Sequence, residues 1–362
     1  LPRYIDSAEP EDLQDIEAHL KGGIPNRDID GLAPYWGVFP SVRRELFSDG
    51  DRPGYSQLRT ESSKIKSAIF GHPEFTEFNH RVTQLFADWK RDSIPLLTGI
   101  RKGDRPKALI ETISESLLDT FRTAQQVATL IDPYGVYQPL MDYWAETMQD
   151  DVWMIASDGW LAVLDGKPNT DLIPPSLVVA RYFAAQQATI EQLEADRDAI
   201  GRQMEEMDEE HGGEDGLLAE AKTDKGKLTA KSVRDRVKVI KGDKEAGDER
   251  QALGAYLALI EQEAAAGKKM KDAQKALDNA CAAKCKVLTE AEIKTLVVDD
   301  KWMAALAGSV QGELDRVSQS LTGRVRQLAE RYATPLPKLN GEVEALGAKV
   351  DEHLKKMGFA WA

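Results

Sequence analysis

Residues 176–211 read SLVVARYFAAQQATIEQLEADRDAIGRQMEEMDEEH, and the spacing of their apolar residues decides the fold of the chain. Positions in alternating steps of four and three hold Val179, Phe183, Gln186, Ile190, Leu193, Arg197, Ile200, Met204 and Met207. Seven of these nine residues are apolar, which is typical of the stripe that faces a partner helix in a coiled coil. Pro174 and Pro175 predict the start of the helix, and Gly212 and Gly213 predict its end.

A helix of this length, about 50 Å, needs another long helix to cover its apolar stripe. A second apolar stripe includes Leu306, Val310, Leu314, Val317, Leu321, Val325, Leu328 and Tyr332. We therefore predict that helices over 176–211 and 302–332 pair antiparallel and form half of a bundle that a partner protein completes. The candidate interface residues are Phe183, Ile190, Leu193, Arg197, Ile200 and Met204. Arg197 should meet an acidic residue or reach the edge, because an unpaired buried arginine is costly.

The remaining patterns predict a mainly α fold with three parts. Residues 1–175 are expected to form a helical domain with a short β-hairpin near 152–164, where two apolar runs flank Asp158-Gly159. Residues 176–335 are expected to form the domain of long antiparallel, coiled-coil-like helices. Residues 336–362 are expected to form an amphipathic helix through Leu339, Val343, Leu346, Val350 and Leu354, followed by the apolar Phe359 and Trp361.

Composition limits the classes of protein to consider. The 362 residues suffice for two or three domains, and the net charge of −14 repels nucleic acid in bulk. Two cysteines give no disulfide framework and suit a reducing cytosol, so we expect a cytoplasmic protein. No apolar run approaches the roughly 20 residues of a membrane span, and no signal peptide is recognisable, so no membrane contact is expected. The chain begins Leu-Pro-Arg and not with Met, which predicts a fragment or a processed product of a longer protein.

The strongest polar signal is a basic segment, residues 222–244, with nine Lys or Arg against three Asp or Glu. One interpretation is contact with the phosphates of duplex DNA, for which the candidates are Lys231, Arg234, Arg236 and Lys238. The other interpretation is a solvated helix that balances the acidic run 205–210. Charge runs are usually solvated faces of this second kind, and the sequence leaves both interpretations open.

No catalytic, cofactor-binding or metal-ligating residues are predicted in this chain. A methyltransferase of amino groups on DNA needs a Gly-rich loop for S-adenosylmethionine and an Asn/Asp-Pro-Pro-aromatic loop for the flipped base. The nearest match, Asp132-Pro133-Tyr134, lacks one proline and follows no expected strand. A chance match to a short motif is the better explanation.

Two further pairs have metal-ligand spacing. Glu77 and His80 are three residues apart on a helix, as in di-iron bundles, but a second such pair is missing, so a surface or capping role is expected. Cys281 and Cys285 share a helix face without further Cys or His nearby, so reduced structural thiols are expected.

Several longer strings carry a resemblance to a known family. They are Arg3-Tyr4-Ile5-Asp6-Ser7, Pro10-Glu11-Asp12-Leu13-Gln14-Asp15-Ile16, Gly22-Gly23-Ile24-Pro25, Phe70-Gly71-His72-Pro73-Glu74-Phe75, Arg105-Pro106-Lys107-Ala108-Leu109-Ile110-Glu111, Met141-Asp142-Tyr143-Trp144-Ala145-Glu146-Thr147-Met148-Gln149-Asp150, Gly212-Gly213-Glu214-Asp215-Gly216 and Val310-Gln311-Gly312-Glu313-Leu314-Asp315-Arg316-Val317. With them the chain resembles the C-terminal part of the modification (M) subunit of type I restriction-modification systems. The likeness covers essentially the whole chain.

This resemblance implies a function for the parent protein. The full-length subunit would methylate adenine N6 in DNA, using S-adenosylmethionine. Its partners would be a specificity subunit that reads the sequence, a second M subunit, a nuclease-translocase subunit and double-stranded DNA. The family's catalytic and cofactor motifs fall before Leu1, so none is carried onto this chain, which is expected to be inactive alone. The alternative is an independent, non-enzymatic helical scaffold or binding protein.

Overall fold

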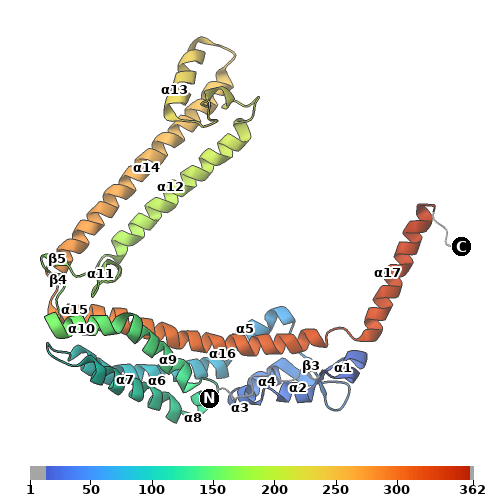
Figure 1. Ribbon diagram of the computed structural model, residues 1–362. Coiled ribbons are helices and arrows are strands. Elements are labelled where there is room, and N and C mark those ends of the chain that lie inside the picture. Colours follow the sequence, from blue (N-terminus) through green and yellow to red (C-terminus); the bar gives the residue numbers. More distant parts are fainter. Residues whose placement is uncertain (1–13, 359–362) are drawn as a thin grey trace. The chain divides into compact units, whose positions relative to one another are not determined.

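The computed structural model describes residues 14–358 and confirms a mainly α fold with long helices and two small antiparallel sheets (Figure 1). The chain divides into two compact units. Unit 1 takes the residues up to Ala156 together with those from Trp302 onward, and unit 2 is Ser157–Lys301. None of the helices within 14–358 combines the length and the apolar run that crossing a membrane requires.

Unit 1 is formed by two separate segments of the chain and contains helices and a three-stranded sheet. Its helices are α1 (Ile16–Lys21), α2 (Asn26–Asp30), α3 (Ala33–Val38), α4 (Pro40–Leu46), η2 (Ser62–Lys64), α5 (Ile65–Phe70), α6 (Pro73–Thr98), α7 (Pro106–Thr123), α8 (Gln125–Ala128), α9 (Pro133–Tyr143), the π-helical η3 (Trp144–Met148), α10 (Gln149–Asp158), α16 (Ala304–Arg331) and α17 (Leu336–Lys356). The strands β1 (Ile24–Pro25), β2 (Phe47–Asp49) and β3 (Tyr55–Leu58) lie in the order β1-β3-β2, all antiparallel.

The core of unit 1 follows from the apolar faces of α6 and α7. Pro73 occupies the first turn of α6, and the His72 ring nitrogen accepts a hydrogen bond from the Glu74 backbone N–H (3.1 Å), so that both features start the helix there. The buried face of α6 runs from Phe75 to Leu97 and includes Trp89, whose indole N–H donates to the carbonyl of Ile113 in α7 (3.1 Å). Burial of large aromatic rings whose polar atoms are paired stabilises this core.

Helix α16 completes this core, because it packs on α5, α6 and α9. Its apolar stripe is buried along its whole length, from Leu306 to Leu328. Just before the helix, the indole N–H of Trp302 donates to Oδ2 of the buried Asp151 (2.8 Å). Burial and the neighbouring charge of Asp151 raise the pKa of Tyr143 to about 12, so the tyrosine stays neutral.

Unit 2 is built on two long helices. Its elements are β4 (Val163–Leu164), β5 (Lys167–Pro168), α11 (Pro175–Tyr182), α12 (Ala184–His211), η4 (Ala219–Ala221), α13 (Ala230–Val239), η5 (Ile240–Gly242), α14 (Gly247–Cys285) and α15 (Glu290–Lys294), and the π-helical η6 (Thr295–Met303) returns the chain to unit 1. Helices α12 and α14 lie side by side, and the segment between them forms a small head with α13 (Figure 1). Tyr256 of α14 and Val233 of α13 belong to the hydrophobic core of this head.

The predicted pairing of 176–211 with 302–332 is wrong. Helix α12 packs against α14, whereas α16 belongs to unit 1, so the predicted domain 176–335 is divided as well. The predicted apolar stripe of α16 is confirmed, because its residues are buried. An apolar stripe shows which face of a helix is covered, but it does not identify the element that covers it. Helices close in sequence tend to be neighbours in space, and α14 follows α12 directly after the head.

The predicted hairpin near 152–164 is also wrong. Most of that range is the helix α10, because Val152, Ile155 and Ala156 are buried at helical rather than alternating spacing. Gly159, with φ of +92°, follows the helix instead of forming a hairpin turn. A hairpin does exist a few residues later, where β4 pairs with β5 around Asp165 and Gly166, both at positive φ.

Candidate partner-docking surface

Helix α17 exposes most of its apolar stripe, of which Leu354 is half-buried. Leu336, Leu339, Val343, Leu346, Val350 and Met357 follow one another in steps of three, four or seven, and all are exposed, Val343 by 68% and Leu346 by 60%. The helix contains no buried residue. Its stripe therefore has the spacing of a helix interface but no covering element among residues 14–358. Phe359 and Trp361, the apolar end expected from the sequence, lie outside the described residues.

The base of α17 adjoins α1, which is also apolar on its outer side. Ile16 and Leu20 lie one helical turn apart on α1 and are 76% and 42% exposed, and α1 contacts α17. A Cβ at Gly22, whose φ is +78°, would stand 3.0 Å from Cγ of Pro335, so glycine lets the start of α17 approach closely. Two helices in contact, more than 300 residues apart in the sequence, thus both carry exposed apolar residues.

Tyr332 holds this junction in place. Its hydroxyl donates to Oδ2 of Asp28 (2.7 Å) and accepts from the backbone N–H of Asp15 (3.3 Å). The same Asp15 caps α1, and the hydrogen bond from the Ala18 backbone N–H is the main reason why the pKa of Asp15 is lowered. Burial, followed by the bond to Asp28, raises the pKa of Tyr332 and keeps its hydroxyl protonated. The sequence pattern predicts Tyr332 only as an apolar stripe residue and gives no sign of the hydrogen bonds that its hydroxyl makes.

The docking surface, defined as the exposed stripe of α17 with Ile16 and Leu20, suits a helix rather than a small molecule. Full burial of a Leu or Val side chain contributes roughly 1.5–3 kcal/mol, so a partner covering several of them would be bound firmly. The stripe is bordered by charged residues, among them Glu342 and Lys349, as on surfaces that pair with another helix. A helix-in-groove or bundle contact uses this arrangement.

The residues predicted at the partner interface lie on α12, except for Phe183 just before it, and α12 packs against α14 within the same unit. Ile190 is buried, whereas Phe183, Leu193, Ile200 and Met204 are half-buried. Phe183 also interrupts the predicted helix, because it has a non-helical backbone (φ −131°, ψ 23°) between α11 and α12. The stripe therefore has a partner inside the chain, and two helices alone leave most of it partly accessible.

The expectation for Arg197 is confirmed. Its guanidinium pairs with Asp198 (2.9 Å) and its side chain keeps 33% exposure. On the α14 side it approaches the sulfur of Met270 at 3.8 Å. The arginine thus reaches the edge of the α12–α14 interface and meets an acid there, which avoids the cost of burying an unpaired charge.

The four DNA candidates of the basic segment have different surroundings. Arg236 is structural, because it pairs with Glu249 (2.6 Å) and its side chain is only 25% exposed. Arg234 pairs with Glu261 (2.7 Å), and Lys238 pairs with Asp235 on its own helix (3.1 Å). Within the described chain, Lys231 is the member of the four with no ion pair, and it is exposed. The positive charge of this segment is therefore partly neutralised by its own unit.

The remaining sequence motifs have structural roles. The carboxylate of Asp132 caps α9 by accepting from the Tyr134 backbone N–H (3.0 Å), and Pro133 sits in the first turn. Cys281 and Cys285 are free and buried, and burial raises the pKa of the Cys281 thiol to about 11, so it stays protonated and unreactive. Groups of three or more His, Cys, Asp and Glu that could hold a metal ion are not found within 14–358.

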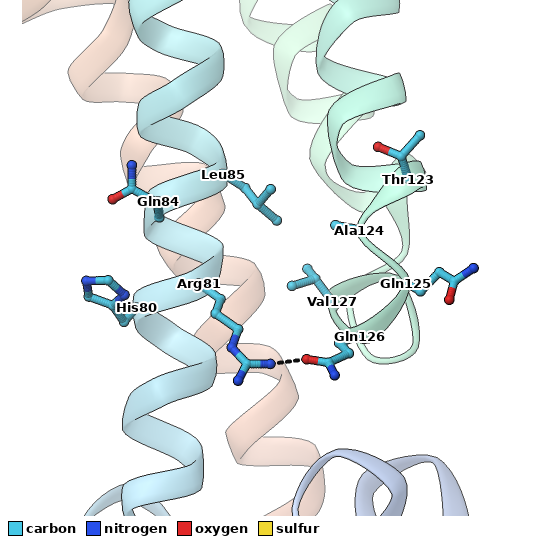
Figure 2. A pocket seen from close by; sticks show the side chains of 9 residues that line it. All are labelled: His80, Arg81, Gln84, Leu85, Thr123, Ala124, Gln125, Gln126 and Val127. Carbon is cyan, nitrogen blue, oxygen red and sulfur yellow. Dashed lines mark hydrogen bonds between the residues drawn. The ribbon is translucent and has the colours of Figure 1, made fainter.

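Glu77 and His80 lie on α6 beside an open hollow of about 500 Å³ between α6 and the α7–α8 junction. Figure 2 shows Arg81 reaching across this hollow to the amide of Gln126. Glu77 accepts a hydrogen bond from the same arginine (3.1 Å). The hollow is lined mainly by amides and apolar groups, including Val127, and its polar groups do not form an acid–base pair or an activated nucleophile.

Comparisons of this chain with protein-family models, with curated proteins and with solved structures find no match.

Proposed function

We propose that this chain is the C-terminal assembly part of the M subunit of a type I restriction-modification system. The observation that carries the proposal is the exposed helix-pairing stripe of α17, seated on α1 through Tyr332 and Pro335. A stripe of this kind requires a partner helix, and the strings that resemble the family supply the class of partner, a specificity subunit. The second M subunit, the nuclease-translocase subunit and duplex DNA would join the same complex.

In this proposal the chain positions its partners and leaves the chemistry to a preceding part of the full-length subunit. That part would bind S-adenosylmethionine and methylate adenine N6 of a flipped base. We expect the present chain by itself neither to bind S-adenosylmethionine nor to methylate DNA. Isothermal titration with S-adenosylmethionine checks this expectation, and stoichiometric binding at micromolar affinity would contradict it.

The decisive test replaces the two central leucines of the stripe, Leu339→Asp together with Leu346→Asp, in the full-length subunit. Interface anchors contribute about 2 kcal/mol or more each, so the affinity for the specificity subunit should fall by about 100-fold or more, and the two proteins should no longer co-purify. The matched control is Ala345→Asp with Ala348→Asp, which adds the same charge to the opposite face of α17 and should leave the complex intact. Unchanged assembly of the leucine variant would overturn the proposal.

The alternative is an independent helical scaffold that uses the same surface for another protein. The reading frame of the gene distinguishes the two, because an Asn-Pro-Pro-aromatic loop encoded upstream supports the methyltransferase subunit. An unrelated upstream sequence supports the scaffold.

The DNA contact is a separate part of the proposal, and Lys231 tests it best. If this residue lies on a phosphate, Lys231→Glu should weaken binding of the assembled enzyme to all sequences alike. The slope of log affinity against log salt concentration should also become less steep by roughly 0.9. An unchanged slope would identify the segment as a solvated face. Arg236 is unsuitable for this test, because its ion pair with Glu249 supports the head of unit 2.

A further inference from the structure

A second candidate surface lies in unit 1, at the loop between α6 and α7. This loop, residues 99–105, and the first turn of α7 carry Arg101, Lys102, Arg105 and Lys107, all exposed, against the single acid Asp104. Among residues 14–358, Arg101, Lys102 and Arg105 have no ion-pair partner, and Lys107 has only a 3.8 Å contact with Glu111 on its own helix. In a chain of net charge −14 this is a concentrated cationic site.

The loop has a defined conformation. The N–H of Gly103, at φ +90°, donates to the carbonyl of Ala156 in α10 (2.8 Å). Oδ2 of Asp104 accepts from the Arg101 backbone N–H (2.8 Å), so this carboxylate closes the turn. The loop is thereby tied to the helical core at its middle and closed by its own acid. A surface fixed in this way loses less conformational entropy when a partner binds.

An apolar groove of about 320 Å³ opens directly beside these cations. Its lining comes from three elements and includes Leu96 of α6, Leu109 of α7 and Val152 of α10, with Arg105 and Asp104 at the loop. Leu96 is 47% exposed, and Trp153, the residue after Val152, is 54% exposed. An exposed Leu and an Arg that line a hydrophobic depression suit a protein interface, in which an apolar centre is bordered by polar groups and Arg is enriched.

We infer that this groove docks a protein helix whose apolar stripe is bordered by carboxylates. The apolar lining would take the stripe, and Arg101, Lys102 and Arg105 would pair with the bordering Asp or Glu side chains. Charge complementarity selects an acidic partner, and the apolar lining favours a protein over a nucleic-acid backbone, because phosphates gain nothing from Leu96 and Leu109. This surface is separate from the stripe of α17, and the inference does not depend on the proposed function.

The test uses fluorescence anisotropy with a fluorescein-labelled amphipathic helical peptide of about 18 residues, about 27 Å long, with a leucine stripe bordered by glutamates. The full chain should bind it with micromolar affinity that falls as salt rises. Arg101→Glu with Arg105→Glu should weaken binding at least tenfold, and Leu96→Ser about threefold. The matched control, Lys225→Glu with Lys227→Glu, makes the same charge change in an exposed loop of unit 2 and should bind as the wild type does.

Three results would overturn the inference. The first is absence of binding, and the second is equal binding of a peptide with lysines in place of the glutamates. The third is binding of a duplex DNA probe of about 20 base pairs, lost in the Arg101/Arg105 variant, while the peptide binds both proteins alike. Circular dichroism of each variant shows that its helices persist, so that a loss of binding is not a loss of folding.

Discussion

Helices α16 and α17 are consecutive and carry apolar stripes of the same spacing, yet their surroundings are opposite. The stripe of α16 is buried, with Leu321 and Val325 fully inaccessible, whereas α17 contains no buried residue and exposes its stripe except for the half-buried Leu354. The two sequences alone do not distinguish a core helix from a docking helix, because periodicity reports which face is apolar and nothing about what covers it. The difference lies in the rest of unit 1, because α5, α6 and α9 pack against α16 and not along α17.

The strongest test of this contrast truncates one leucine on each helix. Leu321→Ala removes a fully buried side chain and should lower the free energy of unfolding of unit 1 by about 2–5 kcal/mol. Leu346→Ala on α17 should change it by less than about 0.5 kcal/mol, since the side chain is already largely in water. Urea denaturation followed by circular dichroism measures both, and equal losses would refute the contrast.

The start of α16 offers a smaller test. Trp302→Phe removes the N–H that donates to the buried carboxylate of Asp151, which then loses one hydrogen-bond donor. We expect a loss of about 1–3 kcal/mol in the free energy of unfolding, the usual cost of a buried polar group whose partner is removed. The same substitution at the exposed Trp153 serves as the control and should leave the denaturation midpoint unchanged.

The start of α17 should be less sensitive. Tyr332→Phe removes the hydroxyl that joins Asp28 and Asp15, and the expected loss is about 0.5–1.5 kcal/mol. For this variant, amide hydrogen exchange is more informative than unfolding, and the exchange rate should increase at the first turn of α17 and in α1. Exchange that speeds up uniformly across unit 1 would show that Tyr332 supports the core rather than the junction.

The smallest expected effect concerns the base of the α12–α14 pair in unit 2. Glu292 accepts hydrogen bonds from Lys284 (2.7 Å), Thr289 and Tyr182, and the bonds from Lys284 and then Thr289 lower its pKa from 4.5 to about 2. Because the folded pKa is depressed, the stabilisation is complete above pH 4.5 and disappears as the pH falls toward 2. The melting temperature of Glu292→Gln should therefore lie below that of the wild type at pH 7 and converge with it near pH 2. A constant difference would exclude ionisation as the cause.

Much of the fold could be predicted from local pattern. The limits of α12 at Gly212 and of α17 at Pro335, and the capping box of Thr289 with Glu292, depend on residues within a few positions of each other. The errors concern what local pattern cannot encode. The choice of α14 over α16 as the partner of α12 is decided by packing between helices that the head, residues 212–246, separates in the sequence. The hairpin predicted near 152–164 is largely the helix α10, because a short apolar run fits both the helical and the strand period.

The docking surface was predictable only in part, because its apolar pattern is local whereas its exposure depends on the rest of the fold. The stripe of α17 is visible in the sequence, but its exposure is not, and neither is the contact of α17 with α1, on which Ile16 and Leu20 are exposed. The basic segment shows the opposite case. Its charge is plain in the sequence, and only the structure reveals that Arg236 and Arg234 are already paired with Glu249 and Glu261.

The interruption of unit 1 by unit 2 has a consequence for the order of events during synthesis. Helices α5, α6 and α9 leave the ribosome before Ser157, whereas α16, which covers them, follows Lys301. At about 5–20 residues per second, translating unit 2 takes on the order of ten seconds, during which the apolar faces that await α16 stay uncovered. Unit 2, whose α12 and α14 are joined through a compact head, can close upon itself within that interval. A nascent chain halted before Trp302 should accordingly contain a folded hairpin of helices beside an unfinished core that chaperones bind.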